Sequence, residues 1–155
     1  MFRIARRSLL LAGLAAGVAR PIAAQTLPTI QVAKDATCPC CEGWVEYLRA
    51  EGFQVSVEVL ADDALDALKT EKGVPDAARS CHTANADGFV LEGHVPAPEI
   101  RRLLAERPAA IGLAVPGMPF GSPGMGPEAE REAYDVLLIG KDGNISVFAS
   151  YPAAA

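Results

Sequence analysis

The sequence predicts one mixed α/β domain, and three observations lead to this prediction. Segments with the periodicity of strands alternate with segments with the periodicity of helices between residues 29 and 107. Of the 155 residues, 50% are apolar and 21% are charged, an ordinary composition for a chain with a single core. The sequence contains neither an internal repeat nor a linker between domains. We therefore expect a single domain over residues 25–155.

The first half of this domain is predicted to run strand, helix, strand, helix. Trp44, Val45 and Leu48 recur at helical spacing after a cysteine-bearing turn, and Gly52 is placed to end that helix. Apolar and polar residues then alternate over 53–59, the pattern of a half-buried strand. The predicted segments are a strand over 29–33, a helix through Glu51, a strand over 53–59, and a helix that begins at Asp62 or Asp63 and closes at 73–75.

The second half is predicted as a hairpin, a helix, an irregular loop and a second hairpin. The first hairpin covers 81–95 and turns at Asp87-Gly88, the helix covers 97–107, and 134–139 pairs with 145–148. Residues 112–127 are rich in Gly and Pro and are predicted as a loop. Up to residue 107 this is the element order of the thioredoxin fold, so we expect a thioredoxin-like domain.

Residues 1–24 have the three parts of an export signal. Three arginines precede a short charge-free run from Leu9 to Val18, and small residues lead up to a cleavage point between Ala24 and Gln25. The Arg6-Arg7 pair also resembles a twin-arginine signal. No cysteine precedes Cys38, so we expect no lipid anchor after cleavage and a location in the periplasm.

The net charge of the predicted mature chain argues against negatively charged partners. Removal of residues 1–24 takes away four of the 14 basic residues and none of the 19 acidic ones, leaving a net charge near −9. Such a chain repels nucleic acid and anionic lipid, so neither is expected as a partner. Paired catalytic carboxylates, a hydrolase triad and a phosphate-binding glycine motif are all missing from the sequence.

Three of the four cysteines lie in Cys38-Pro39-Cys40-Cys41, where the first helix begins. Exposed N–H groups at a helix N-terminus favour thiolates, which are both redox nucleophiles and the soft ligands that copper(I) prefers. Cys38 and Cys41 form a C-x-x-C pair typical of thiol–disulfide exchange, or of a structural disulfide. The inserted Cys40 would compete with that pairing, so metal binding is the favoured interpretation.

The fourth cysteine, Cys81, stands beside His82 where the third strand begins. In thioredoxin-like folds this position lies beside the cysteine turn, so Cys81 is expected to be a ligand rather than a small buried residue. Adjacent strand residues face opposite sides, which leaves open whether Cys81 or His82 points inward. His94, at the end of the same hairpin, is a further candidate ligand or else a structural residue.

Met118 and Met125 lie on the Gly/Pro loop. Methionines often fill apolar gaps, but their thioethers are also soft ligands that select copper(I). Met118 is the stronger candidate because the neighbouring prolines Pro116 and Pro119 fix its backbone.

Several motifs in fixed order resemble the CopG-like copper-resistance family, whose members were long described only as a domain of unknown function. The resemblance extends from Ile30 to Phe148. It is carried by Cys38-x-Cys40-Cys41-x-x-Trp44, Gly73-Val74-Pro75, Ser80-Cys81-His82-Thr83, Glu92-Gly93-His94-Val95-Pro96, Gly112-Leu113-Ala114-Val115-Pro116-Gly117-Met118-Pro119 and Gly121-Ser122-Pro123-Gly124-Met125. Pro39 departs from the family, in which many members have Gly at that position.

The resemblance implies a periplasmic, thioredoxin-like protein in which the C-x-C-C cysteines help to bind a multi-copper cluster. Carried onto this sequence, it gives Cys38, Cys40, Cys41 and Cys81 as ligands, with His94 and Met118 as supplementary ligands. The expected function is copper resistance, with copper(I) as the metal and other periplasmic copper-handling proteins as partners. Two alternatives stay open at this stage: a thiol–disulfide oxidoreductase that uses Cys38 and Cys41, and a structural zinc module.

Overall fold

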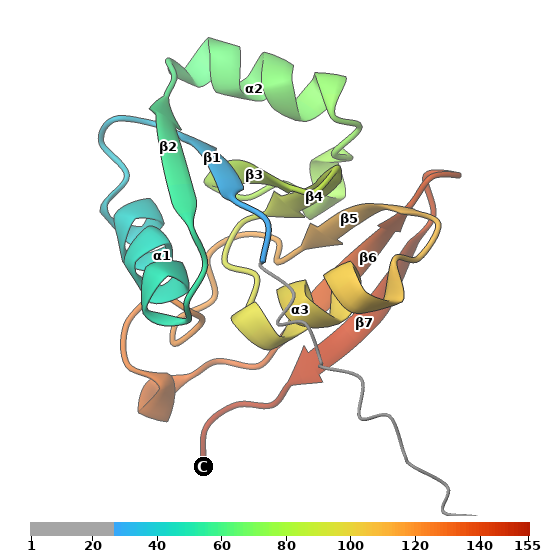
Figure 1. The fold of residues 1–155 in the computed structure, drawn as a ribbon. Helices are drawn as coiled ribbons and strands as arrows, with labels where there is room; N and C mark the ends of the chain where they lie inside the picture. The colour runs from blue at the N-terminus through green and yellow to red at the C-terminus, as the bar shows by residue number, and fades with distance from the viewer. Residues whose placement is uncertain (1–26) are drawn as a thin grey trace, which may run out of the picture.

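A mixed sheet with helices on both of its faces forms the centre of the molecule (Figure 1). The structure is a computed structural model that describes residues 27–155; the predicted export signal lies outside this range. In chain order the elements are β1 (Ile30–Lys34), α1 (Pro39–Ala50), β2 (Val55–Val59), α2 (Asp62–Glu71), η1 (Asp76–Ala78), β3 (His82–Ala86), β4 (Phe89–Glu92), α3 (Ala97–Glu106), β5 (Ala110–Ala114), η2 (Glu128–Glu130), β6 (Tyr134–Gly140) and β7 (Ile145–Tyr151). Among the described helices, none has the length and apolar character needed to cross a membrane.

The sheet has seven strands in the order β2-β1-β3-β4-β5-β6-β7. Two neighbouring pairs, β1 with β2 and β4 with β5, are parallel, and the other pairs are antiparallel. The predicted order of strand, helix, strand, helix, hairpin and helix is present, and so is the C-terminal hairpin. The sequence predicted six strands, however, and the seventh is β5.

The missed strand β5 begins before the predicted loop and includes Gly112. Gly112 lies directly opposite Val90 in the parallel pairing of β5 with β4. A Cβ atom at residue 112 would collide with the backbone carbonyl of Val90. Glycine is therefore required here because two backbones approach closely inside the sheet. The prediction of an irregular loop over all of 112–127 was wrong at its start for this reason.

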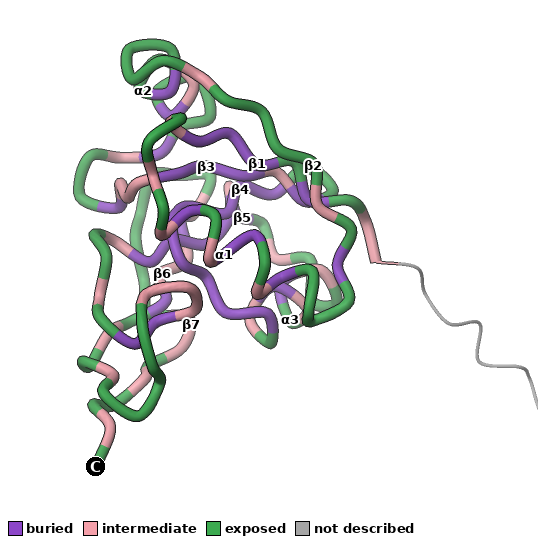
Figure 2. Tube along the Cα trace, turned by 90° about the vertical axis from the view of Figure 1, so that its left-hand side faces the viewer, coloured by how far each residue is buried: buried purple, intermediate pink, exposed green. Residues whose placement is uncertain are grey.

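The two faces of the sheet are covered differently. Helices α1 and α3 bury Trp44, Leu48 and Ile100 against the inward-facing residues of β1, β3 and β4. Helix α2 lies across the opposite face (Figure 1), on the side where Val90 of β4 is buried. The central strands β1, β3, β4 and β5 form the buried middle of the molecule (Figure 2). Successive residues of β3 and β4 consequently point toward opposite helix layers.

The first hairpin has the turn that the sequence predicted. Asp87 and Gly88 both have positive φ angles, of 50° and 88°, and they join β3 to β4. Two-residue turns with this backbone match the twist of antiparallel strands, and the Asp-Gly pair tolerates it well. The hairpin thereby fixes β3 and β4 side by side, which brings the segments that precede β3 and follow β4 to the same end of the sheet.

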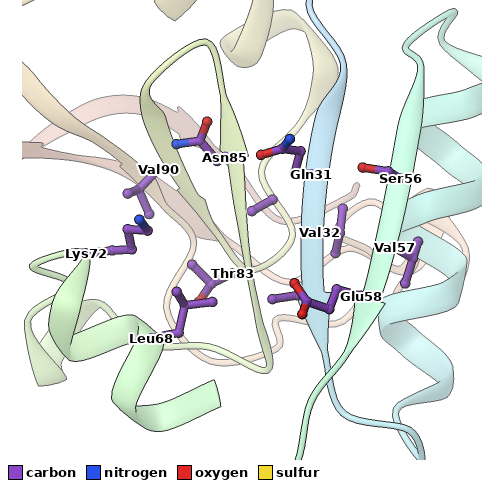
Figure 3. Close-up of a pocket in the computed structure, with 12 residues that line it drawn as sticks. Gln31, Val32, Ser56, Val57, Glu58, Leu68, Lys72, Thr83, Asn85 and Val90 are labelled. Carbon is purple, nitrogen blue, oxygen red and sulfur yellow. The ribbon is translucent and has the colours of Figure 1, made fainter. Parts of the chain in front are cut away.

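A groove of about 490 Å³ lies between part of α2 and the sheet (Figure 3). Side chains of β1, β2 and β3 point into it from the sheet, and Leu68 and Lys72 approach from α2. Among the described residues that line it, none is a cysteine, histidine or methionine. The soft-ligand side chains are gathered elsewhere, at the N-terminal end of α1.

Candidate metal centre

The cysteine turn starts α1 in the way that the sequence predicted. Cys38 is the N-cap residue, Pro39 occupies the first turn, and the Cys38 sulfur accepts a hydrogen bond from the Cys41 N–H at 3.3 Å. Proline suits this position because the first N–H groups of a helix have no partner within the helix. The sulfur atoms of the turn therefore lie beside the positive end of the helix dipole.

Cys38 and Cys41 are joined by a disulfide in this structure, whereas Cys40 and Cys81 are free thiols. The spacing alone argued against such simple pairing, because Cys40 competes for the same partners. That argument was wrong for this state of the protein. Residues three apart across the first helical turn can face each other, whereas Cys40 and Cys41 are adjacent and rarely present disulfide geometry. In this form Cys38 and Cys41 offer no thiolates until the bond is reduced.

Cys40 lies at the centre of the outer part of the cluster, which also contains Cys38 and Met118. Its sulfur lies 3.3 Å from the sulfur of Cys38, 3.9 Å from that of Cys81 and 3.8 Å from the thioether sulfur of Met118. The sequence-predicted Met118 is thus brought to the cysteines, although 53% of it is exposed. Met125 lies on the same loop, where its backbone closes a tight turn with Gly121 and Ser122.

Cys81 lies at the centre of the inner part of the cluster, which also contains His82 and His94. Its sulfur lies 3.3 Å from Nδ1 of His82 and 3.3 Å from Nε2 of His94. Both imidazoles are buried, with no exposed surface. Their rings meet edge to face at 5.1 Å between centroids. The structure therefore brings His94 to the site as predicted and adds His82.

The backbone explains why the side chains of both Cys81 and His82 can face the donor cluster. Strand β3 begins at His82, so Cys81 belongs to the preceding bend and does not follow the alternation of the strand. The side chains of both residues can therefore turn toward the same donors. Sequence reasoning left His82 open because it placed the strand start one residue too early.

The hydrogen bond of His94 identifies which of its nitrogens is free. Its Nδ1 lies 2.7 Å from the carbonyl oxygen of Pro123. A carbonyl oxygen only accepts, so Nδ1 carries the proton and donates it. The lone pair of Nε2 consequently points toward Cys81, which is the arrangement of a metal-binding imidazole.

The Gly/Pro loop is held against α1 at a point where only glycine fits. A Cβ atom on Gly124 would collide with the backbone of Gly43 and Trp44. Trp44 in turn donates from its indole N–H to the carbonyl oxygen of Val95 at 2.9 Å, and its ring lies 4.5 Å from the ring of His82. The loop therefore supplies Pro123 and Met118 to the cluster from a fixed position.

Burial keeps the inner donors uncharged. It raises the pKa of the Cys81 thiol to about 12, and the nearby Cys40 adds to the rise. It lowers the pKa of His82 well below 6.5, and the neighbouring His94 and the positive charge of Lys69 lower it further. Burial also lowers the pKa of His94, against the opposing effect of the Pro123 carbonyl. The imidazoles are thus neutral and ready to ligate, whereas a metal ion must displace the proton of Cys81.

Two groups of donor atoms overlap in this cluster. Cys38, Cys40, Cys41 and Cys81 form one group, and Cys81, His82 and His94 form the other; within each, all donor atoms lie within 4.8 Å of one another. Cys81 belongs to both. Sulfur and imidazole donors at this spacing are suited to soft and borderline metal ions.

One family model and two solved structures resemble this chain. Residues 78–125 match the family described as "Protein of unknown function, DUF411". Two solved structures of a copper resistance protein copG, form 2 and form 1, each share 46% sequence identity with this chain and superpose with a TM-score of 0.76. They match over 81% and 82% of this chain and over 99% of their own length. A search of curated proteins found no match. Identity this high over nearly the full length of the solved relatives shows common descent, and the chain belongs to the CopG-like DUF411 family.

Proposed function

We propose that this protein binds copper(I) in the bacterial periplasm and serves copper resistance. The proposed ligands are Cys38, Cys40, Cys41 and Cys81, with His94 and Met118 as supplementary ligands. His82, whose Nδ1 faces the Cys81 sulfur, is added to that set. The copper is the cargo of the protein, and more than one ion can be held because thiolates bridge metal ions.

The observation that carries this proposal is the position of Cys81 between two donor groups. Its sulfur is 3.9 Å from the sulfur of Cys40 and 3.3 Å from a nitrogen of His94. A thiolate at that point can bridge an ion held by the cysteines and an ion held by the histidines. Separate segments of the chain supply these donors, and such convergence is hard to explain by packing alone.

Copper is favoured over zinc by the donor types. Met118 places a thioether 3.8 Å from the Cys40 sulfur, and thioethers select copper(I) whereas structural zinc sites use thiolate and imidazole. The solved relatives are copper resistance proteins, which supports the same choice.

The proposed location and architecture rest on separate observations. The tripartite pattern of residues 1–24 supports export to the periplasm, and the Arg6-Arg7 pair supports the twin-arginine route. The order β2-β1-β3-β4, with α1 and α3 on one face and α2 on the other, supports a thioredoxin-like core extended by β5, β6 and β7.

Anaerobic titration of the protein with copper(I), in competition with a chelator, tests the proposal. It is run on the fully reduced protein and on the protein with the Cys38–Cys41 disulfide. We expect tight uptake by the reduced form and lower stoichiometry in the disulfide form, since the disulfide removes two thiolates. If neither form competes with the chelator, the protein does not bind copper(I) tightly and the proposal fails.

A thiol–disulfide oxidoreductase remains the second candidate, and the Cys38–Cys41 disulfide at the start of α1 favours it. In such an enzyme a thiolate attacks the disulfide of a substrate, and the second cysteine then releases the product. This role predicts that exchange with a substrate disulfide survives the substitutions Cys81→Ser and His94→Gln. Under the copper proposal the same substitutions instead weaken metal binding.

A further inference from the structure

A buried ion pair lies beneath the donor cluster, on the α2 side of the sheet. The ammonium of Lys69 is 2.6 Å from Oε1 of Glu92, and the Glu92 side chain has no exposed surface. The Thr83 hydroxyl accepts from Lys69 at 2.8 Å and donates to Oε2 of Glu92 at 2.5 Å. Thr83 also lines the groove of Figure 3. Burying two charges costs about as much as their attraction returns, so stability alone does not explain this pair.

The Glu92 carboxylate accepts a further hydrogen bond, from a residue next to the donor cluster. Its Oε1 accepts the backbone N–H of Ser80 at 2.7 Å, and Ser80 immediately precedes Cys81. The Ser80 hydroxyl donates to the carbonyl oxygen of Gly117, and the two backbones also form an isolated bridge. Gly117 immediately precedes Met118. One carboxylate therefore holds the point where the Cys81 segment meets the Met118 loop.

The segment that follows Glu92 also packs against Ser80 and His82. Gly93 donates its N–H to the carbonyl oxygen of His82 at 3.0 Å and has a φ angle of 70°. A Cβ atom on Gly93 would collide with the side chain of Ser80. His94 follows directly. The segments that carry Cys81, His94 and Met118 are thus fixed to one another within a few residues of Glu92.

We propose that Glu92, with its charge balanced by Lys69, is a positioning residue for copper binding. By accepting the Ser80 N–H it sets the position of the Cys81 thiolate relative to His94 and Met118. This inference rests on the copper-binding function proposed above. The charge balance matters because an unpaired carboxylate would be costly to bury, whereas the ion pair holds Ser80 without adding net charge beside the thiolates.

Positioning can be separated from stability by replacing both members of the pair. An apolar pair of similar volume is often as stable as a buried ion pair, so the fold should survive such a change. In one double variant, Glu92→Gln with Lys69→Met, the amide oxygen can still accept the Ser80 N–H. In the other, Glu92→Met with Lys69→Met, the acceptor is lost. The two variants carry the same charge and differ in whether residue 92 can accept this hydrogen bond.

The test is copper(I) affinity by anaerobic chelator competition on the full reduced protein, together with the ultraviolet thiolate-to-copper absorption. We expect the variant without the acceptor to bind about 10- to 100-fold more weakly and to show an altered absorption band, as for other residues that orient ligands. The double variant that carries Glu92→Gln should stay close to the unmodified protein. The exposed pair Arg102 and Glu106, changed together to Gln, controls for removal of charge.

The possible outcomes are distinct. If the unmodified protein takes up no copper, both the function and the positioning role are overturned. If it binds copper and both double variants bind it equally well with the same spectrum, the positioning role alone is overturned. Thermal melts followed by circular dichroism check folding. Should this apolar variant not fold, Glu92→Leu with Lys69→Leu, which also lacks an acceptor for the Ser80 N–H, provides the same test, and an unchanged band and affinity overturn the proposal.

Discussion

The inner and outer parts of the donor cluster differ in how far solvent reaches them. His82 and His94, which flank Cys81, have no exposed surface, whereas 53% of Met118 beside Cys40 is exposed. Trp44 packs against the ring of His82, and the Pro123 carbonyl accepts from the ring of His94. The outer sulfurs lie on a helix start and a surface loop.

This difference separates two requirements of a copper-binding protein. A buried, neutral donor set has a fixed geometry and excludes water, which favours strong retention. An exposed sulfur can contact an incoming ion or a partner before the ion is fully enclosed. We therefore expect the inner part to determine affinity and the outer part to determine the rate of exchange.

The largest effect is expected from Cys81→Ser, because this change removes the thiolate that both donor groups share. Copper(I) affinity should fall by more than the roughly 10- to 100-fold that loss of a supporting residue causes. Cys40→Ser should reduce affinity less, since His82, His94 and Cys81 remain together. Chelator competition on the two reduced variants makes the comparison directly.

Thermal melts of the two metal-free variants show whether a loss of affinity comes from unfolding. Serine in place of either cysteine keeps the side-chain shape, and neither free cysteine is fully buried. Both metal-free variants should therefore melt near the temperature of the unmodified protein. Equal loss of affinity in the two variants would contradict the division into inner and outer parts.

The inner part should also give the metal-free protein a characteristic dependence of stability on pH. The pKa values of His82 and His94 lie below the ordinary 6.5, so the unfolded chain binds more protons below that pH. Stability is complete above about pH 6.5 and is lost as the pH falls, by up to about 1.4 kcal/mol per pH unit for each histidine. At the alkaline end, burial raises the pKa of the Cys81 thiol from 9.0 to about 12. The stability that the protonated thiol contributes is therefore complete below pH 9.0 and is lost as the pH rises above it.

Urea unfolding of the reduced, metal-free protein between pH 5 and pH 10 measures this dependence. His82→Leu should flatten the acid side of the curve, because one of the two buried imidazoles is gone. A free energy of unfolding that stays constant between pH 7 and pH 5 would show that the histidines are not held neutral by burial. The groups that face His82 with positive charge, Lys69 and Lys34, act in the same direction and are present in both proteins.

The parts of the fold that could be predicted are those whose signal is local. Helix α1 follows from Trp44, Val45 and Leu48 at helical spacing, and all three are buried against the sheet. The Asp87-Gly88 turn follows from residue types that tolerate positive φ. Strand β5 could not be found in this way, because Gly112 is required by a contact with Val90 that exists only after folding.

The candidate site shows the same limit. The cysteines, His94 and Met118 were found because sulfur and imidazole side chains are rare and chemically distinctive. Glu92 and Lys69 were not singled out, since acidic and basic residues are common and are exposed in most proteins. Their burial depends on the pairing of β3 with β4 and on the position of α2. A glutamate within an otherwise apolar strand was the one signal that the sequence offered.

The smallest predicted effect concerns the outer part and separates the two loop methionines. Met118→Leu removes the thioether that lies 3.8 Å from the Cys40 sulfur, at a side chain that is half exposed. Leucine has a similar volume, so stability should hardly change, and affinity should fall by less than about tenfold, or ~1.4 kcal/mol. The rate of copper(I) transfer to a chelator, measured by stopped flow, should change more clearly than the affinity does.

Met125→Leu is the matched control, because Met125 contributes its backbone to the loop turn. If the two variants release copper at the same rate, Met118 is a packing residue and the exchange role of the outer part rests on Cys40 alone.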